Sequence, residues 1–374
     1  MKIFYLTNLL TPYRIEWINM LSYTHQIEAY YLYDSDITRE KDWLTYSTPM
    51  FKTKKASAYK LYHNSPTRSF LRVLRSREYD ACIIDGYSSL FKLKVLQEML
   101  RQNVTVLVNV DGIDIWKRKS FSDYIKDQIK YKVFRSGAYF LCGSRIAADA
   151  IIDCGADRDK VCVHPFTSLH KNEIITIEEK RSLQEQYKKK LHRENQKVAL
   201  GVGRFIPLKK YECLIRAWKD MPDDCYLYLI GGGELKEDYE KLIRDLDIRN
   251  IELLDFILPE KLNEYFYAAD LFVHPSSTET WGLVINEAMA KGCPVIATYH
   301  CVSAVELIRD GIEGYLTAVG DEDDLKEKMT AILNDDALRA DMSANVIERI
   351  QPYTYENMAD IHLKLLERIK NDKR

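Results

Sequence analysis

The chain has 374 residues, of which 46% are hydrophobic and 29% are charged, with a net charge of -2. This composition is ordinary for a soluble globular protein and gives no support to nucleic acid as a partner. The length suits two domains, each with its own core. Residues 1–165 hold 25 Lys and Arg against 18 Asp and Glu, and the remainder holds 29 against 38. The basic first half is therefore expected to face something anionic.

The cysteines and the apolar segments indicate a cytoplasmic protein. Its eight cysteines are scattered and include no Cys-x-x-Cys pair, so we expect reduced, mostly buried thiols. The first residues lead directly into a strand, and no segment contains about 18 consecutive uncharged apolar residues. We therefore expect neither a signal peptide nor a membrane-spanning helix.

Apolar runs alternate with helical stretches along the chain, a rhythm typical of parallel strands joined by crossover helices. A charged segment interrupts it at 169–195 and is predicted to be a connection ending in a short helix. The sequence thus predicts an α/β protein with Rossmann-like domains at 1–168 and 196–352, and an amphipathic helix at about 353–374. The expected strands are 3–7, 27–33, 81–84, 104–110, 138–142, 161–163, 198–202, 226–230, 251–254, 271–275 and one beginning at 294.

In the first domain, a carboxylate and an arginine are the candidate functional groups. Asp111 directly follows the apolar strand 104–110, and Gly112 permits a tight turn there. We interpret Asp111 as a candidate to orient or deprotonate an acceptor hydroxyl, with turn capping as the alternative. Arg14 lies near a helix start and is expected to be solvated, although it could meet a phosphate or an acidic acceptor.

Three basic stretches of the first domain suggest a surface for anionic lipid. They are residues 52–55, 68–77 and 121–135. Each cation near such a membrane contributes about 1 kcal/mol. An ordinary solvated helix face is the alternative reading of the same charges.

The second domain opens with a glycine loop that carries two cations. Gly203 follows the strand 198–202, and Arg204 and Lys209 project from the same loop. An arginine fork and a mobile lysine charge can together offset the negative charge of a departing diphosphate. Further along, Gly231-Gly232-Gly233 follows the next strand, where glycine lets backbone and ligand approach closely. Both loops are also common wherever a strand feeds a helix.

The most informative stretch sets two glutamates around a turn that begins a helix. Glu279 follows the strand 271–275, Gly282 forms the turn, and Glu287 lies about one helical turn further in. Free N–H groups around Leu283 and Val284 favour a diphosphate, and a carboxylate inside the helix can accept hydrogen bonds from two ribose hydroxyls. A capped amphipathic helix with two solvated glutamates is the alternative.

This stretch and the Gly-Arg-x4-Lys loop resemble the retaining, nucleotide-sugar-dependent glycosyltransferases of family 4. The resemblance implies the GT-B fold: two facing Rossmann-like domains, with the C-terminal helix crossing back onto the first. It places Phe256 at the nucleotide base and the acceptor on the first domain. The chain departs from the family where Lys210 replaces a common glycine, where Leu9–Pro12 replace a paired-glycine loop, and near Asp111, where no histidine is present.

The resemblance implies a glycosyltransferase of the hexosyltransferase class that moves a sugar from a nucleoside diphosphate sugar to a hydroxyl of a glycan or lipid-linked acceptor. It further implies retention and a role in cell-surface polysaccharide or glycoconjugate synthesis. The expected catalytic residues are Glu279, Arg204, Lys209 and Asp111, and the expected donor contacts are Glu287, Gly203, Gly232, Phe256, Thr280, Gly282, Leu283 and Val284.

We expect no metal and no cofactor beyond the donor itself, because the His and Cys residues lack ligand spacing. The expected location is cytoplasmic, with peripheral contact to the inner face of the membrane. Three alternatives remain: a nucleotide-sugar epimerase, a phosphorylase, and a non-catalytic nucleotide-sugar-binding component.

Overall fold

The computed structural model describes residues 1–34, 47–56, 68–87, 89–112 and 121–372. The chain forms two compact units. Unit 1 comprises Met1–Thr167 and Thr354–Arg374, and unit 2 comprises Ser168–Tyr353. Segment 169–195, predicted to be a connection, thus lies in unit 2. Its 14-residue helix α7 (Ile177–Lys190) begins with a capping box between Thr176 and Glu179 and packs against α10 (Pro259–Ala268).

Unit 1 is a doubly wound sheet with every described strand pair parallel. Its strand order is β3-β2-β1-β4-β5-β6-β7. The strands are β1 (Lys2–Thr7), β2 (Gln26–Tyr31), β3 (Lys52–Lys55), β4 (Ala81–Asp85), β5 (Thr105–Val110), β6 (Tyr139–Cys142) and β7 (Val161–Val163). The helices are α1 (Pro12–Ser22), α3 (Arg68–Arg75), α4 (Leu90–Arg101), α5 (Phe121–Phe134), α6 (Arg145–Asp153) and α15 (Tyr355–Asp372).

The sequence analysis did not predict β3, because Lys52-Thr-Lys-Lys55 has no apolar alternation and was interpreted only as positive charge. Lys52 is exposed at this described edge of the sheet, where a charged strand is well tolerated. The core of unit 1 is aromatic and aliphatic, with Phe4 and Tyr30 stacked at 5.1 Å.

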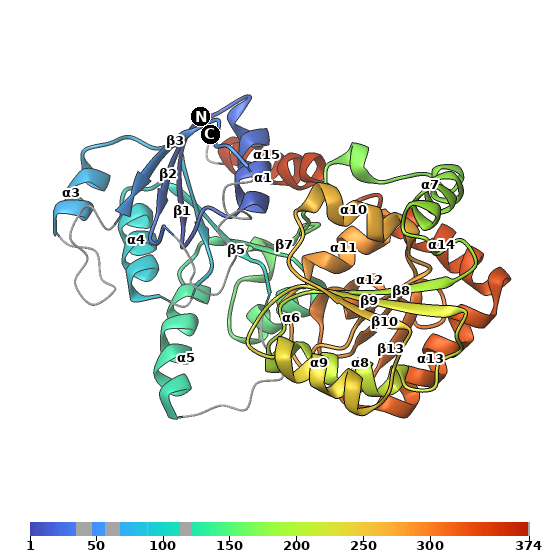
Figure 1. The fold of residues 1–374 in the computed structure, drawn as a ribbon. Coiled ribbons are helices and arrows are strands. Elements are labelled where there is room, and N and C mark those ends of the chain that lie inside the picture. The colour runs from blue at the N-terminus through green and yellow to red at the C-terminus, as the bar shows by residue number, and fades with distance from the viewer. Residues whose placement is uncertain (35–46, 57–67, 88, 113–120, 373–374) are drawn as a thin grey trace. The chain divides into compact units, whose positions relative to one another are not determined.

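Helix α15 completes unit 1 although unit 2 separates it from the rest of that unit in the chain. It lies beside α1 (Figure 1). Its apolar face is buried, and His362 is packed between Trp17, at 4.7 Å between ring centres, and His164, at 5.1 Å. The crossing of the C-terminal helix back onto the first unit, which the resemblance implied, is thereby confirmed.

Unit 2 repeats the same winding over six parallel strands, in the order β10-β9-β8-β11-β12-β13. Helices α8, α9 and α13 pack on one face of this sheet, with α10, α11 and α12 on the other (Figure 1). The strands are β8 (Lys197–Val202), β9 (Cys225–Ile230), β10 (Ile251–Leu254), β11 (Leu271–His274), β12 (Val295–Thr298) and β13 (Gly314–Thr317). The remaining helices are α8 (Tyr211–Trp218), α9 (Lys236–Asp245), α11 (Leu283–Ala290), α12 (Val302–Leu307), α13 (Glu322–Asn334) and α14 (Asp336–Ile350).

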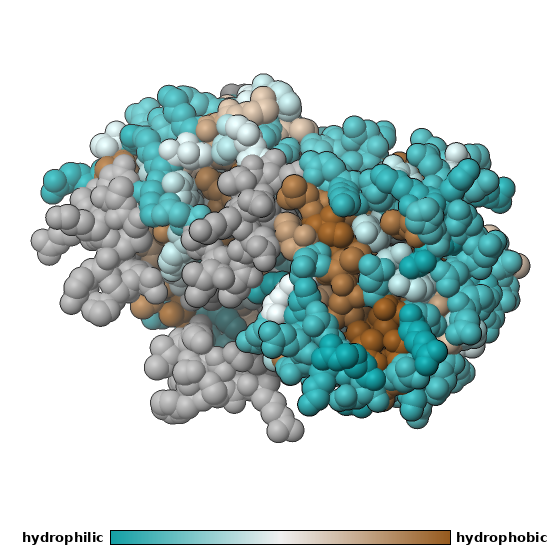
Figure 2. All heavy atoms as spheres, viewed as in Figure 1, coloured by the Kyte–Doolittle hydropathy of each residue, from teal (hydrophilic) through white to brown (hydrophobic). Residues whose placement is uncertain are grey.

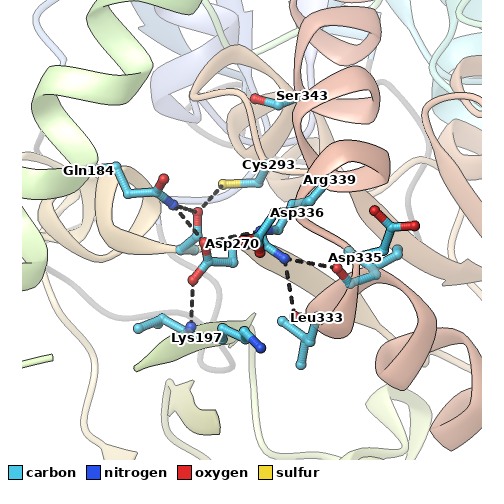
Figure 3. A network of polar contacts seen from close by, with 12 residues as sticks. Gln184, Lys197, Asp270, Cys293, Leu333, Asp335, Asp336, Arg339 and Ser343 are labelled. Carbon is cyan, nitrogen blue, oxygen red and sulfur yellow. Dashed lines mark hydrogen bonds and ion pairs between the residues drawn. The ribbon is translucent and has the colours of Figure 1, made fainter. Parts of the chain in front are cut away.

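A buried carboxylate ties the amino-terminal edge of this sheet to three surrounding elements. Asp270, 4% exposed and one residue before β11, accepts a hydrogen bond from the Val198 N–H at 2.7 Å. It also accepts from Gln184 at 3.0 Å and pairs with Arg339 at 3.4 Å (Figure 3). A second ion pair joins Asp270 to Lys188 at 2.6 Å. Asp270 therefore contacts residues of α7, β8 and α14 at the same time.

Candidate nucleotide-sugar site

In unit 2, the carboxyl ends of β8 and β11 meet where the order of the strands reverses. These strands pair in parallel, and in sheets of this kind ligands bind in the crevice outside the carboxyl ends at such a reversal. The loop after β8 runs through a short 3-10 turn, Pro207–Lys209. The Ser277 N–H, in the loop after β11, donates to the Leu208 carbonyl at 2.8 Å. The two loops therefore form one surface.

Lys209 and Glu279 form an ion pair at this point, although 70 residues separate them in the chain. Both side chains are largely buried, with exposed fractions of 14% and 22%. The backbone holds Glu279 as well, because its N–H donates to the His300 carbonyl at 2.9 Å and its carbonyl accepts from Val302 at 3.2 Å. The structure thus brings together two of the predicted catalytic residues.

His274 is the third member of this group, and the sequence analysis missed it. It ends β11, is fully buried, and has its Nε2 atom 3.0 Å from the Ser276 hydroxyl and 3.7 Å from Glu279 Oε2. Its signal in the sequence was a polar residue closing the otherwise apolar strand Leu271–His274. Burial lowers the pKa of His274, so the ring is neutral at pH 7.

Glu279 is ionised in this setting. Burial alone would raise the pKa of its carboxyl, but the histidine and the Lys209 charge outweigh burial and lower it to about 2. His274 Nε2 lies 3.7 Å from Glu279 Oε2, which is too far for a full hydrogen bond. The histidine therefore acts on the carboxylate charge mainly through the dipole of its ring. A carboxylate that stays ionised at all physiological pH values is suited to accept hydrogen bonds from sugar hydroxyls.

The glycine loops after β8 and β9 are locked against each other. The Phe205 N–H donates to the Gly232 carbonyl at 2.7 Å, and the Leu235 N–H donates to the Phe205 carbonyl at 3.0 Å. A Cβ on Gly231 would lie 1.9 Å from the Gly203 carbonyl oxygen, so no side chain fits there. At Gly232, by contrast, a Cβ would meet nothing within 4 Å. Gly231 serves loop packing, while Gly232 faces open space where a ligand could approach.

The turn before α11 depends on the left-handed conformation of Gly282, whose φ is 99°. A Cβ at this position would lie 3.1 Å from Glu279 Cγ and 3.2 Å from Cys301 Sγ. Gly282 precedes Leu283 and Val284, whose N–H groups open the helix and have no intrahelical partner by the geometry of a helix start. The positive end of α11 therefore lies beside Glu279.

Glu287 lies inside α11, and its side chain is hydrogen-bonded to Ser168. The Ser168 hydroxyl donates to Glu287 Oε1 at 2.9 Å across 119 residues of sequence, which no local pattern could have predicted. Burial raises the pKa of the Glu287 carboxyl to about 7, and Glu173 adds to that effect while the hydrogen bond from Ser168 opposes it. The carboxyl thus changes charge near neutral pH.

The other predicted donor contacts are exposed near the same edge. Arg204 and Thr280 have exposed side chains. Phe256, after β10, is 37% exposed, Leu208 is 50% exposed and Tyr299, after β12, is 48% exposed. Large apolar side chains therefore remain accessible beside three strand ends of unit 2, as a ligand site requires. On the face drawn in Figure 2, hydrophilic residues cover most of unit 2 and hydrophobic atoms show in the middle.

Lys210 adopts a left-handed conformation with φ of 55° at the residue before α8. This is the position where the family commonly has glycine, and a residue with a Cβ is strained there. Its side chain pairs with Glu212 at 3.1 Å. Lys210 therefore keeps the backbone turn that glycine would make, but its backbone is strained.

In unit 1, Arg14 bridges Asp85 and Asp111 at the carboxyl ends of β4 and β5. The expectation that Arg14 is solvated is wrong: its side chain is 13% exposed, because two carboxylates hold it. Burial raises the pKa of Asp111, and the Arg14 charge opposes that rise. Asp111 itself is 26% exposed. The sequence signal for Asp85 was a carboxylate ending the apolar strand Ala81–Asp85.

This cluster extends to the C-terminal helix. Asn109 donates to Asp85 Oδ1 at 2.9 Å, and Asn109 Oδ1 lies 3.1 Å from His362 Nε2. The Tyr5 hydroxyl donates to Asp85, and Lys92 donates to the Asp85 carbonyl. Asp85 is thus the centre of a buried polar network that reaches from β1 to α15.

None of the eight cysteines forms a disulfide in the structure, and six of them are buried. Within the described residues, no group of three or more His, Cys, Asp or Glu side chains is arranged to hold a metal ion. Among the same residues, no helix combines the length and apolarity that crossing a bilayer requires.

Two doubly wound units, the second with a cation, paired glycine loops and a helix start at its strand-order reversal, define the chain as a GT-B-type α/β protein. HepE of Anabaena, solved in complex with UDP and glucose, superposes with a TM-score of 0.75 at 18% identity, covering 98% of this chain and 99% of that one. WaaG, a glycosyltransferase involved in lipopolysaccharide biosynthesis, superposes with a TM-score of 0.70 at 16% identity, covering 97% and 99%. The predicted fold class is confirmed.

Residues 183–349 match the family described as glycosyl transferases group 1. The lipopolysaccharide core biosynthesis glycosyltransferase LpsE of Rhizobium meliloti is 26% identical over 62% of this chain and 65% of its own length. An N-acetylgalactosaminyltransferase of Campylobacter jejuni that acts on a diphospho-undecaprenol-linked sugar is 31% identical over 46% and 44%. The matching segment thus spans between 44% and 65% of these relatives.

Proposed function

We propose that the protein is a glycosyltransferase that moves a sugar from a nucleoside diphosphate sugar to a hydroxyl of a glycan or lipid-linked acceptor, with retention of anomeric configuration. The observation that carries the proposal is the meeting of Lys209, Glu279 and the start of α11 at the strand-order reversal of unit 2. The known activities of LpsE and the Campylobacter enzyme support it, as does UDP in HepE.

In this proposal, the bond between the anomeric carbon and the phosphate oxygen breaks, and the charge that develops on the diphosphate is offset by Lys209, Arg204 and the N–H groups at the start of α11. Glu279 accepts hydrogen bonds from the sugar, and Glu287 accepts them from the ribose hydroxyls. Phe256 stacks on the base. No metal or further cofactor takes part.

The acceptor hydroxyl is assigned to unit 1, where Asp111 orients it or takes its proton. Asp111 is partly exposed while its pairing with Arg14 fixes its position. An Asp111→Asn variant that transfers sugar at the wild-type rate would remove Asp111 from the chemistry.

The donor assignment is tested by a thermal-shift screen over nucleoside diphosphate sugars, beginning with UDP-glucose, which is bound in a solved HepE structure. A donor that binds only the folded state raises the melting temperature by mass action. No shift with any donor, followed by no heat of binding in calorimetry, would reject the proposal. Consumption of donor without acceptor would indicate an epimerase instead.

We also propose a cytoplasmic location with peripheral contact to anionic lipid, in keeping with a role in cell-surface polysaccharide or glycoconjugate synthesis. Strand β3 carries Lys52, Lys54 and Lys55 at an edge of the unit 1 sheet, although Lys55 also pairs with Asp34. Sedimentation with vesicles of phosphatidylcholine alone and with added phosphatidylserine tests it, and equal binding to both would exclude the contact.

A further inference from the structure

His274 lies directly behind the Lys209–Glu279 pair, out of reach of any ligand. It is fully buried at the last position of β11, where its backbone pairs with Ala297 and its ring stacks against Phe272 with centres 6.2 Å apart. A side chain in this place cannot touch a sugar or an acceptor. Any effect it has on the reaction must pass through Glu279.

The surroundings of the ring select one tautomer. The Nε2 atom faces the Ser276 hydroxyl at 3.0 Å and the ionised Glu279 carboxylate at 3.7 Å. The Nδ1 atom is buried and has no hydrogen-bond partner among the described residues. A proton on Nδ1 would leave a buried N–H unsatisfied and would turn the Nε2 lone pair toward a negative charge. The neutral ring therefore carries its proton on Nε2.

The two carboxylate oxygens of Glu279 have different surroundings. Lys209 and His274 both contact Oε2 of Glu279. Among the described residues, the contact with the lysine charge and the contact with the histidine ring are both made by Oε2. The other oxygen, Oε1, makes neither of these two contacts and is therefore available to accept a hydrogen bond from a hydroxyl.

We propose that His274 is a positioning residue: as the Nε2–H tautomer it fixes Oε2 of Glu279 together with Lys209, so that Oε1 is presented to a hydroxyl of the donor sugar. The inference rests on the proposed function and deepens it, because it assigns recognition of the sugar, as distinct from the nucleotide, to a buried histidine. Loss of the Nε2–H group should weaken the sugar contact and leave the nucleotide contact intact.

The test compares His274→Leu, which removes the donor group, with His274→Gln, whose amide can place an N–H near the same point. Binding of UDP-glucose and of UDP is measured by calorimetry for each folded variant. For His274→Leu we expect UDP-glucose affinity to fall about threefold, because a ring N–H 3.7 Å from a carboxylate acts more weakly than a full hydrogen bond, with UDP affinity unchanged. His274→Gln should keep most of the wild-type affinity for both.

Several results would overturn the inference. Equal losses for UDP and UDP-glucose in His274→Leu would show a merely structural role, as would unchanged affinity for both. Glu279→Ala should lose the same selectivity, and a double variant should lose no more than Glu279→Ala alone. Wild-type protein that binds neither ligand would count against the proposed donor, not against the histidine.

The tautomer is tested without any ligand. Nitrogen-15 NMR of the imidazole should show His274 protonated at Nε2, with Ser276→Ala, which keeps the histidine, as a control for assignment. Observation of the Nδ1–H tautomer in the free protein would overturn the inference whatever the donor proves to be.

Discussion

The two units have the same winding, but the buried carboxylate with the most ionic partners lies at the amino-terminal edge of the sheet in unit 2 and the Arg14 network lies at the carboxyl edge in unit 1. In unit 2, the Asp270 network lies at the amino-terminal edge, and the Lys209–Glu279 pair lies at the carboxyl edge. In unit 1, the Arg14–Asp85–Asp111 network lies at the carboxyl edge itself, where ligands of such sheets bind. Stability and ligand binding should therefore be separable by mutation in unit 2 and coupled in unit 1.

The largest effect on stability is expected for Asp270→Ala. This change leaves Lys188 and Arg339 without their shared buried carboxylate and removes the acceptor of the Val198 N–H. Breaking a buried ion pair of this kind costs about 3–5 kcal/mol. Calorimetric melting should show the loss, while the affinity of the folded variant for UDP should be unchanged. Reduced UDP affinity in a folded variant would show that the two edges of unit 2 are coupled.

Lys209→Ala tests the other edge of unit 2 and should reverse that pattern. In the proposed function Lys209 offsets the charge of the leaving group, so its removal should lower turnover by about 10²–10³-fold. The melting temperature should fall by less than in Asp270→Ala, because Lys209 forms one ion pair, whereas Asp270 holds two cations and a backbone N–H. Lys210→Ala is the matched control, since this neighbouring lysine pairs with Glu212 and not with Glu279. Equal loss of turnover in both variants would contradict the assignment.

Arg14→Met tests the coupling in unit 1. The two carboxylates, one of them 2% exposed, then lack their shared cation. We expect a loss of about 2–3 kcal/mol, below the range for fully buried pairs because Asp111 is partly exposed. Transfer activity should fall together with stability. Loss of stability at full activity would place the acceptor away from this cluster.

The units should also respond to acid in opposite directions. In unit 1, burial lowers the pKa of His362 to about 4 from an ordinary 6.5, so the unfolded state binds the extra proton and stability is lost as pH falls from about 6.5 to 4. In unit 2, burial raises the pKa of Glu287 to about 7 from 4.5, so the folded state binds the extra proton. Stability therefore increases as pH falls from 7 to 4.5. Melting curves of each unit between pH 4 and 8 check the two slopes.

The smallest expected effect is a gain. Lys210→Gly removes the Cβ from a left-handed residue and should stabilise unit 2 by about 1 kcal/mol, less the Glu212 pair that is lost. Turnover should be unchanged. Destabilisation in thermal melting would show that the pair with Glu212 outweighs the backbone strain.

The fold could be predicted, and Glu279, Gly282 and Glu287 could be proposed as donor residues, because their signals are local. Apolar strands, the Gly282 turn and the spacing of Glu279 and Glu287 all lie within a few residues of one another. The features that the sequence did not predict depend on partners far away in the chain. Arg14 was expected to be solvated because its two carboxylates lie 71 and 97 residues away, and Ser168 meets Glu287 across 119 residues. Strand β3 was missed because its residues are charged, and pairing with β2 alone makes it a strand.

Helix α15 has a consequence for the synthesis of the chain. Unit 1 needs residues from 354 onward, which leave the ribosome only after all of unit 2, so the unit that begins first is completed last. Until then, Trp17 lacks the ring of His362, and Asn109 lacks one partner beside Asp85. Nascent chains stalled before residue 354 should therefore hold a native unit 2 beside a first unit that chaperones still recognise.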